Sequence, residues 1–502
     1  RTGKTENLFG DGHEHHDSNH PYTFDLDIFG RFSLFSFMNR TVTEKGSNLL
    51  ATWLKGPSEE PVILLRQQAV QELSEKQAFK EAFLRTFFLG EKNETRLINW
   101  VSSFKVVLHE KRLLKSLIFI LPATSLALLA GAFFISELWA LLLVSVVINY
   151  IVLNANAAKV TLIHNHINNQ EGLLLKYSRL IHLISAEPFT ENLTSSLRNE
   201  LLEYHQAEKE LKKLSGYSRM LDNRYNVIVS ILLNIFSFWE VHVAMAVEKW
   251  FLKNGKNVDH WVRIIGEFDA LVSIAVLHYN HPQWPFADIH TGYFRLEAVK
   301  IGHPLIAESQ RVTNDYSLSG NRQTDIITGS NMGGKSTFLR TLGVNMVLAL
   351  AGAPVCAGKM IVAPAKIMTS MRVMDSLEEN ASSFYAELER IKNILQQVEH
   401  GEKCLLLLDE VLKGTNSTDR HTGSKALIRQ LLKNEVAALI ATHDLQLTDL
   451  AADLPDHIRN FHFDVTVENE ELYFDYKLKP GICKSFNASL LMKKIGIDID
   501  SL

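Results

Sequence analysis

The chain has 502 residues, and its 52 Lys and Arg residues against 56 Asp and Glu residues give a formal net charge of −4. This balance excludes a strong overall attraction for nucleic acid, although it leaves room for a local basic patch. Hydrophobic residues make up 46% of the chain, enough for large cores in roughly three domains. The three cysteines, Cys356, Cys404 and Cys483, have no paired spacing and indicate a reduced, cytoplasm-facing environment.

Residues 1–23 form a polar, His-rich lead-in without the apolar core of a signal peptide. Its histidines cluster at four positions: His13, His15, His16 and His20. Such a tract can chelate a metal ion, whereas a disordered lead-in is the simpler interpretation. Because the sequence opens on Arg1 rather than Met, it can also be a fragment of a longer chain.

Residues 24–112 are predicted to be helical. Apolar residues recur at three- and four-residue spacing between Leu34 and Leu54, which is typical of amphipathic helices. Thr43 suits the N-cap of one such helix, and the Gly and Pro at 56–57 end it.

Two apolar runs follow within residues 113–157. The first, 116–135, carries no charged residue over twenty positions, which is the length that spans a bilayer. The second, 138–153, is shorter and includes Asn149, and the turn between the runs carries a single glutamate. We expect a transmembrane helical hairpin that contacts the membrane through residues 116–153. A buried helix pair in a soluble core is the alternative.

Basic residues gather at the two outer ends of the hairpin: Lys111, Arg112 and Lys115 before the first run, and Lys159 after the second. By the positive-inside rule, both ends face the cytoplasm. The expected location is therefore the cytoplasmic membrane, with the C-terminal domain on the cytoplasmic side. If the helices instead belong to a soluble core, the cytoplasm is the expected location.

Residues 158–290 continue the helical pattern. The stretch 194–224 alternates acidic and basic side chains, as on a solvated helix face. Residues 227–238 are apolar but bordered by charge, so a core helix fits them better than a third membrane span. Two prolines then mark a boundary, and short β-branched strands alternate with helices beyond it. This change predicts an α/β domain over residues 291–502.

The most informative motif lies near the start of that domain and matches G-x-x-x-x-G-K-[ST]. It consists of Gly329, Ser330, Asn331, Met332, Gly333, Gly334, Lys335, Ser336 and Thr337. A β-like run, 324–328, precedes it and a helical pattern follows it, as a phosphate-binding loop requires. Lys335 would neutralise the β- and γ-phosphates of ATP, and the Ser336 hydroxyl would ligate Mg²⁺.

An acidic pair follows the apolar run 404–408, which has the composition of a buried parallel strand. Asp409 would hold Mg²⁺, directly or through water, and Glu410 would polarise the attacking water. His443 follows the next β-like run and could sense the γ-phosphate through a hydrogen bond. We therefore predict an ATP hydrolase in which Glu410 and His443 act together with Lys335.

Ser382 and Ser383 lie between the loop and the acidic pair, just before a predicted helix that begins at Tyr385. Serines at this position are ordinary N-caps. They could also present hydroxyl and N–H groups to a phosphate held by a partner subunit. The residue types alone do not decide between these two roles.

Together these motifs resemble the MutS family of DNA mismatch repair proteins. The loop contains the family's Asn-Met-Gly-Gly core at 331–334, residues 382–384 resemble its signature, and 441–443 resemble its histidine switch. Asn314 resembles a residue that borders the adenine. Weaker similarity upstream, for example at 25–30, resembles the start of the family's helical lever.

The resemblance implies an α/β P-loop ATPase domain of the ABC class, preceded by an all-α lever domain that here contains the predicted transmembrane hairpin. It implies ATP and Mg²⁺ as cofactors, and a homodimer in which Ser382 and Ser383 of the partner subunit close each nucleotide site. Hydrolysis would open the dimer and move the lever. Duplex DNA is the implied target, yet the family's mismatch-reading N-terminal domain has no counterpart in this sequence. A membrane-anchored mechanochemical ATPase or scaffold without mismatch recognition is therefore the alternative.

Overall fold

The structure is a computed structural model. It describes residues 9–89, 100–109, 111–168, 171–203, 207–222, 227–320, 322–330, 332–372, 383–399, 403–434, 436–468 and 471–483. The chain groups into two compact units, which we call the sheet unit and the helical unit. The sheet unit comprises Arg1–Arg40, Asn48–Glu75 and Leu271–Leu502, and the helical unit comprises Thr41–Ser47 and Lys76–Ala270. The units interleave along the chain, whereas the sequence predicts domains as consecutive stretches.

The helical unit consists of helices, as predicted for this part of the chain. They are α4 (Gln77–Arg85), η2 (Thr86–Leu89), α6 (Arg112–Ala132), α7 (Leu138–Asn168), α8 (Glu171–Ala186), α9 (Asn192–Glu203), α10 (Ala207–Asp222), α11 (Val227–Ser237) and most of α12 (Trp239–Asn280). Helix α2 (Glu44–Leu54) begins in this unit.

Buried carboxylates on α12 hold two loops of the helical unit. Glu248 is fully buried and accepts the backbone N–H groups of Val107 (2.6 Å) and Leu108 (2.9 Å). Asp269, also fully buried, accepts the backbone N–H of Thr43 (2.8 Å), whose hydroxyl accepts the N–H of Gly46 (3.0 Å). Thr43 therefore caps α2 as predicted, and each buried charge is offset by several hydrogen bonds.

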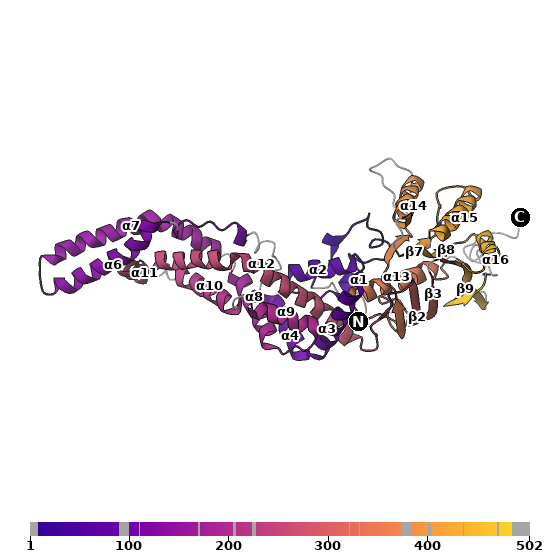
Figure 1. The fold of residues 1–502 in the computed structure, drawn as a ribbon, viewed down its shortest axis with the longest axis horizontal. Coiled ribbons are helices and arrows are strands. Elements are labelled where there is room, and N and C mark those ends of the chain that lie inside the picture. The colour runs from indigo at the N-terminus through magenta and orange to yellow at the C-terminus, as the bar shows by residue number, and fades with distance from the viewer. Residues whose placement is uncertain are drawn as a thin grey trace. The chain divides into compact units, whose positions relative to one another are not determined.

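Helices α6 and α7 form an antiparallel hairpin within the helical unit (Figure 1). Their stretches Leu113–Ala132 and Leu138–Ile167 are long and apolar enough to cross a membrane, judged by length and composition. The second extends well beyond the predicted run 138–153. Because core helices of soluble proteins pass the same test, burial is the property that separates the two interpretations. Within an apolar 18-residue window of each stretch, only 22% and 17% is buried.

The sheet unit combines two sheets with flanking helices. Its strands are β1 (Asp288–Ile289), β2 (Arg295–Ile301), β3 (Asn314–Ser319), β4 (Gln323–Gly329), β5 (Lys359–Val362), β6 (Lys366–Ser370), β7 (Cys404–Asp409), β8 (Ala437–Ala441), β9 (Ile458–Glu468) and β10 (Glu471–Pro480). Its helices are η1 (His13–His15), α1 (Leu34–Met38), α3 (Glu60–Glu75), α13 (Lys335–Ala351), α14 (Ser383–Glu399), α15 (Ser417–Lys433), η4 (Leu445–Asp449) and α16 (Leu450–Asp453).

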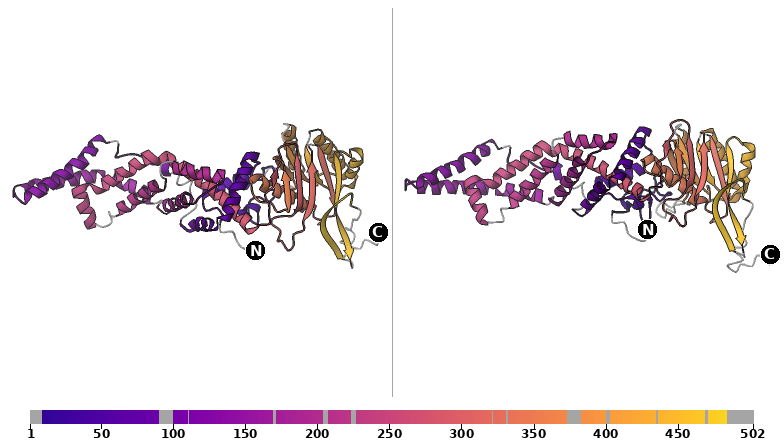
Figure 2. Two further views of the ribbon diagram at one scale, coloured as in Figure 1. Left: turned by 60° about the horizontal axis from the view of Figure 1, so that its bottom comes forward. Right: turned by 90° about the horizontal axis from the view of Figure 1, so that it is seen from below.

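The larger sheet has the strand order β10-β9-β4-β8-β7-β6, and all its neighbours are parallel except β10 and β9. Strands β9 and β10 extend from it as a two-stranded ribbon (Figure 2). The smaller sheet has the order β1-β5-β2-β3. Every residue of β7 and β8 is buried, as expected for strands covered on both faces.

Helices cover both faces of the larger sheet. Alternate side chains of a strand point to opposite faces. Leu406 and Leu408 of β7 belong to a buried cluster that includes residues of α14 and α15. Leu407, between them, lies against Gly343 of α13, where an added Cβ would meet its side chain at 2.9 Å. Helix α13 therefore packs on one face and α14 and α15 on the other.

The N-terminal residues 9–23 pack on later parts of the sheet unit. The Asn39 side-chain amide donates to the Phe9 carbonyl (2.9 Å), and the Thr369 N–H donates to the Pro21 carbonyl (2.9 Å). The expectation of a disordered lead-in is therefore wrong for these residues. Among the residues that the structure describes, His, Cys, Asp and Glu form no group of three that could hold a metal.

Candidate nucleotide site

A cavity of about 400 Å³ opens at the carboxyl ends of β4 and β7. Ligands of open α/β sheets bind in this position. The cavity is lined by residues of the phosphate loop, including Ser330 and Gly333 to Thr337, and by Glu410. His303 also lines it, and burial, with Arg340 nearby, lowers the pKa of His303 to about 4, so its ring is neutral at pH 7.

Glycines shape the loop between β4 and α13. Gly329 has φ +150°, and a Cβ on it would lie 2.9 Å from the backbone oxygen of Phe463. Gly334 has φ +101° and forms the N-cap of α13. The Gly333 N–H donates to the Ser330 carbonyl (3.2 Å), while Met332 at the tip is 75% exposed. The strand, loop and helix expected around the motif are present, and Asn331 lies outside the described residues.

The Lys335 side chain lies inside the loop. Its ammonium donates to the carbonyls of Gly329 (2.8 Å) and Ser330 (3.0 Å), and lies 3.2 Å from Nε2 of His443. Burial lowers the pKa of Lys335, while the carboxylates of Glu410 and Asp409 act in the opposite direction. Lys335 thus supplies a positive charge at the cavity wall, where a phosphate would be neutralised.

The Ser336 hydroxyl donates to Oδ2 of Asp409. The other carboxylate oxygen, Oδ1, is buried and has no hydrogen-bond partner in the described part of the chain. A buried oxygen of this kind fits a cation. Mg²⁺ usually takes only one or two protein carboxylates together with substrate phosphates and water. Ser336 and Asp409 therefore fit the predicted Mg²⁺ site without a larger set of acidic ligands.

Glu410 follows Asp409 directly and turns toward the neighbouring strand. Its backbone adopts φ +53°, and its N–H donates to the Ala441 carbonyl (2.8 Å). Its carboxylate pairs with His443 Nε2 (2.8 Å) and with Lys413 Nζ (3.3 Å). The hydrogen bond from His443, helped by the Lys413 charge, lowers the pKa of Glu410 to about 2. The glutamate is therefore ionised at neutral pH.

Three further residues were predicted for the site: Asn314, Ser382 and Ser383. Asn314 lines the cavity at its rim, where its amide donates to the Tyr476 carbonyl (3.1 Å) and its oxygen accepts the Leu478 N–H (2.8 Å). Ser383 begins α14, and nothing is described of its side chain. Ser382 lies outside the described residues.

Several residues in or beside the cavity were not singled out from the sequence. Lys413 follows Glu410 by three positions, but a basic residue at that distance is no specific signal. Tyr476 and Phe463 come from β10 and β9, and only the strand pairing brings them to the loop. Gly334 lies against the Tyr476 ring, since an added Cβ would be 3.1 Å from it.

An ionic network beside the site was also missed. Asp27 pairs with Arg372 (2.7 Å), which ends the described segment after β6, and with Arg340 of α13 (3.4 Å). Asp25 is fully buried and pairs with Arg390 of α14 (2.8 Å). Asp27 therefore joins α13 to Arg372, which precedes residues 382–384 in the sequence. Asp25, two positions earlier, binds Arg390, which follows them.

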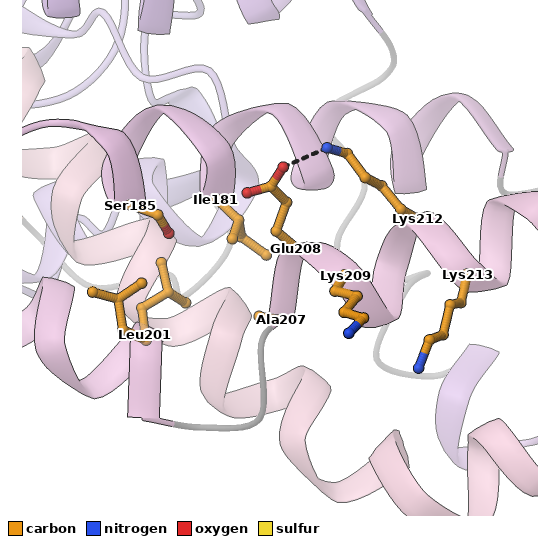
Figure 3. A pocket seen from close by; sticks show the side chains of 9 residues that line it. Ile181, Ser185, Leu201, Ala207, Glu208, Lys209, Lys212 and Lys213 are labelled. Carbon is orange, nitrogen blue, oxygen red and sulfur yellow. Dashed lines mark hydrogen bonds and ion pairs between the residues drawn. The ribbon is translucent and has the colours of Figure 1, made fainter.

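A second cavity, of about 660 Å³, lies in the helical unit among α8, α9 and α10 (Figure 3). Its apolar wall includes Ile181 and Leu201, and three lysines of α10 line it. Two of these lysines are paired with carboxylates, Lys212 with Glu208 and Lys213 with Glu210. The cavity is larger than the candidate nucleotide site, but its charged lining residues all come from α10, so volume alone does not single it out as a binding site.

Comparison with known proteins assigns the family. The model of MutS domain III matches residues 21–275, about half of the chain, and the model of MutS domain V matches residues 325–494. The chain belongs to the MutS family. The two MutS domains correspond to the predicted helical lever and to the α/β domain with its phosphate loop.

Curated relatives agree with this assignment. The chain is 31% identical over 264 residues to the DNA mismatch repair protein MutS of Persephonella marina, covering 52% of this chain and 29% of the relative. It is 32% identical over 256 residues to the DNA mismatch repair protein MutS of Aquifex pyrophilus, covering 50% and 28%. The matched part thus spans less than a third of these relatives' length.

Proposed function

We propose that this MutS-family chain is an ATP hydrolase whose nucleotide state switches a homodimer. The observation that carries the proposal is the convergence of Lys335, the Ser336–Asp409 pair and the Glu410–His443 pair. Lys335, Ser336 and Glu410 line one cavity, and Asp409 and His443 contact them. A phosphate cradle, a cation site and an ionised carboxylate are the parts that phosphoryl transfer to water needs.

Within this proposal, residues 329–337 bind the phosphates through backbone N–H groups and the start of α13. Lys335 moves its ammonium from the loop carbonyls to the β- and γ-phosphates. Asn314, at the rim, borders the adenine. Mg²⁺, when bound, would neutralise phosphate charge, and Ser336 and Asp409 would hold it.

Glu410 and His443 orient the attacking water. The carboxylate is ionised, so it accepts a hydrogen bond from water and aligns it rather than storing a proton. His443 Nε2 lies near both Glu410 and Lys335, and it can either donate to the carboxylate or accept from the ammonium. A γ-phosphate that draws the lysine away would therefore favour the hydrogen bond to Glu410. This arrangement makes His443 a positioning residue between the charge of the nucleotide and the water.

The dimer completes the site. We propose that Ser382 and Ser383 of the partner subunit face the γ-phosphate, in line with the family resemblance. ATP would hold two subunits together, and hydrolysis would release them. ATPase turnover should then rise with protein concentration until the dimer saturates, and a concentration-independent turnover would contradict the dimeric site.

Two variants test the nucleotide chemistry. Lys335→Ala is expected to abolish ATP binding, measured by isothermal titration. Glu410→Ala is expected to keep binding and to lose hydrolysis by about 10²–10⁴-fold. Lys359→Ala changes an exposed lysine of β5 and should leave both unchanged. Full ATPase activity in the Glu410 variant would refute the assignment.

Duplex DNA is the proposed target of the switch, because the curated relatives are named DNA mismatch repair proteins. Binding should then weaken steeply with salt, with log K falling by about 0.9 per phosphate contact for each unit of log salt. No retention on DNA at low salt would argue against this target.

The second candidate is a membrane-anchored mechanochemical ATPase or scaffold without mismatch recognition, located at the cytoplasmic membrane. The exposed apolar α6–α7 hairpin is the observation that favours it. The near-neutral net charge also favours it over DNA binding. In that case nucleotide binding and hydrolysis persist while duplex DNA has no effect on either.

A further inference from the structure

The α6–α7 hairpin has the dimensions of a bilayer crossing. Helix α6 has 21 residues, which at about 1.5 Å per residue give a length of about 32 Å. The hydrocarbon core of a bilayer is about 30 Å thick. A tight turn joins the helices, with the Leu138 N–H donating to the Ile135 carbonyl (3.2 Å). Helix α7, with 31 residues, begins at the turn and extends beyond the start of α6 at the open end of the hairpin.

The outer surface of the hairpin is apolar along its length. Large apolar side chains are exposed on both helices: Phe119 (66%), Ile120 (56%), Leu126 (50%), Leu141 (54%), Leu143 (67%), Val144 (53%), Tyr150 (63%) and Ile151 (59%). Glu137, in the turn, is the only acidic or basic residue between positions 116 and 158. A contiguous apolar surface of this extent is unusual for a protein surface in water and marks a contact with another apolar phase.

The inner surface of the hairpin is polar where the helices meet. The hydroxyls of Ser125 and Ser145 lie 2.6 Å apart. The Asn149 side-chain amide donates to Ser125 Oγ (2.8 Å) and to the Ile235 carbonyl at the end of α11 (2.9 Å). All three polar side chains are buried. They lie about halfway along the hairpin, since each serine is about ten residues from the turn.

This pattern is the inverse of a soluble helix pair. In water, a hairpin buries apolar side chains and exposes polar ones. In lipid, polar groups must find partners inside the protein, and the outer face is free to be apolar. A partner protein would instead be expected to meet polar groups at the rim of the surface. The polar interior and uncharged exterior therefore favour acyl chains as the covering phase.

The two ends of the hairpin differ in charge. Lys159 and Lys111 lie side by side at the open end, although they are 48 positions apart in the sequence. The closed end carries Glu137 and a pair of aromatic rings, Phe133 and Trp139, whose centroids are 6.2 Å apart. Basic residues on the cytoplasmic side and aromatic residues at the interfaces are typical of membrane spans.

We propose that the α6–α7 hairpin crosses a lipid bilayer, with its open end on the cytoplasmic side and its turn on the far side. The contacts among Ser125, Ser145 and Asn149 hold the two helices together at mid-depth. This proposal supplies the anchor that the second candidate function needs, and it does not depend on nucleotide chemistry.

Cysteine labelling tests the crossing directly. Lys105→Cys places a thiol in the exposed segment before α6, and Ser136→Cys places one in the turn. The native cysteines are all buried, so the unchanged full chain serves as the background control. In inverted membrane vesicles, a membrane-impermeant maleimide should label Lys105→Cys at once. It should label Ser136→Cys at least tenfold more slowly until detergent is added. Equal labelling of both thiols without detergent would overturn the crossing.

A matched pair of lysine substitutions tests the lipid contact. Ile151 on α7 and Leu252 on α12 are both 59% exposed. Ile151→Lys should disfavour insertion by on the order of a hundredfold, seen as release of the full chain by alkaline carbonate. Leu252→Lys should leave the membrane-bound fraction unchanged. The unchanged chain should float together with phosphatidylethanolamine–phosphatidylglycerol vesicles. If it does not float with them and stays dispersed without detergent, another protein or a second copy covers the hairpin, and the proposal is wrong.

Discussion

Replacing His443 by alanine separates two ways in which this histidine could serve hydrolysis. It could keep Glu410 ionised, or it could hold the carboxylate in the position that aligns water. The hydrogen bond between them is 2.8 Å long and is the main reason that the pKa of Glu410 lies at about 2 rather than at 4.5. Both roles are consistent with this contact, so they must be separated by magnitude.

The pKa values decide which role matters at neutral pH. The difference between 4.5 and about 2 corresponds to at most about 3 kcal/mol, and the 31% exposure of the Glu410 side chain reduces that figure. Without His443, Lys413 still lowers the pKa of Glu410 while partial burial raises it, so the pKa returns toward 4.5. Glu410 would remain ionised at pH 7.5. Loss of activity in His443→Ala must then come from lost positioning.

We therefore expect His443→Ala to lower kcat by about 10²-fold at pH 7.5, with no recovery between pH 7 and 9. Steady-state ATPase assays across this range measure it. His457→Ala, which removes a ring bonded to the Arg322 carbonyl outside the cavity, is the control. A rate that recovers with rising pH would refute positioning and show that His443 acts by ionising Glu410. In the unchanged protein, the depressed pKa of Glu410 stabilises the fold above about pH 4.5, and this contribution is lost as the pH falls toward 2.

Two further predictions concern stability, measured by chemical unfolding. Gly329→Ala should lower the free energy of unfolding by about 2–3 kcal/mol and prevent nucleotide binding, because the added Cβ would press on the Phe463 carbonyl at an unfavourable φ. The control is Gly320→Ala, where φ is +103° and nothing lies within 4 Å, and it should cost only about 1 kcal/mol. Equal losses would contradict this account. Asp25→Ala leaves buried donors and the partly buried Arg390 without their partner and should cost about 3–5 kcal/mol, whereas Asp27→Ala, at a 41% exposed side chain, should cost about 1 kcal/mol or less. The reverse order would show that burial does not control these pairs.

The local structure around the phosphate-loop motif could be predicted because it depends on neighbouring residues. The phosphate loop needs glycines at positive φ and a lysine at a helix start, and these features lie within nine consecutive residues. The strand that ends in Asp409 could be predicted because an uninterrupted apolar run fits a strand buried on both faces. The prediction of Thr43 as an N-cap was confirmed for the same reason.

Contacts between distant residues could not be predicted from local pattern. The order β4-β8-β7, which brings His443 between Lys335 and Glu410, is a property of strand pairing. Helix α12 runs over 42 residues and includes the buried Glu248 and Asp269, whose partners the local pattern does not reveal. Those carboxylates are tolerated only because distant backbone N–H groups satisfy them.

The Asp27 network joins α13, the helix that follows the phosphate loop, to the end of β6. Arg340 lies five residues after Lys335 on α13, and Arg372 immediately precedes the segment that carries the signature. Both arginines hold the same carboxylate, at 3.4 and 2.7 Å. If α13 moves against the end of β6, one of these ion pairs must break or Asp27 must move with it. The chain from Asp27 leads within 20 residues to Thr43, which lies near the start of the helical unit and donates its N–H to Asp269. The segment that carries Asp27 is therefore continuous in sequence with the unit that carries the apolar hairpin.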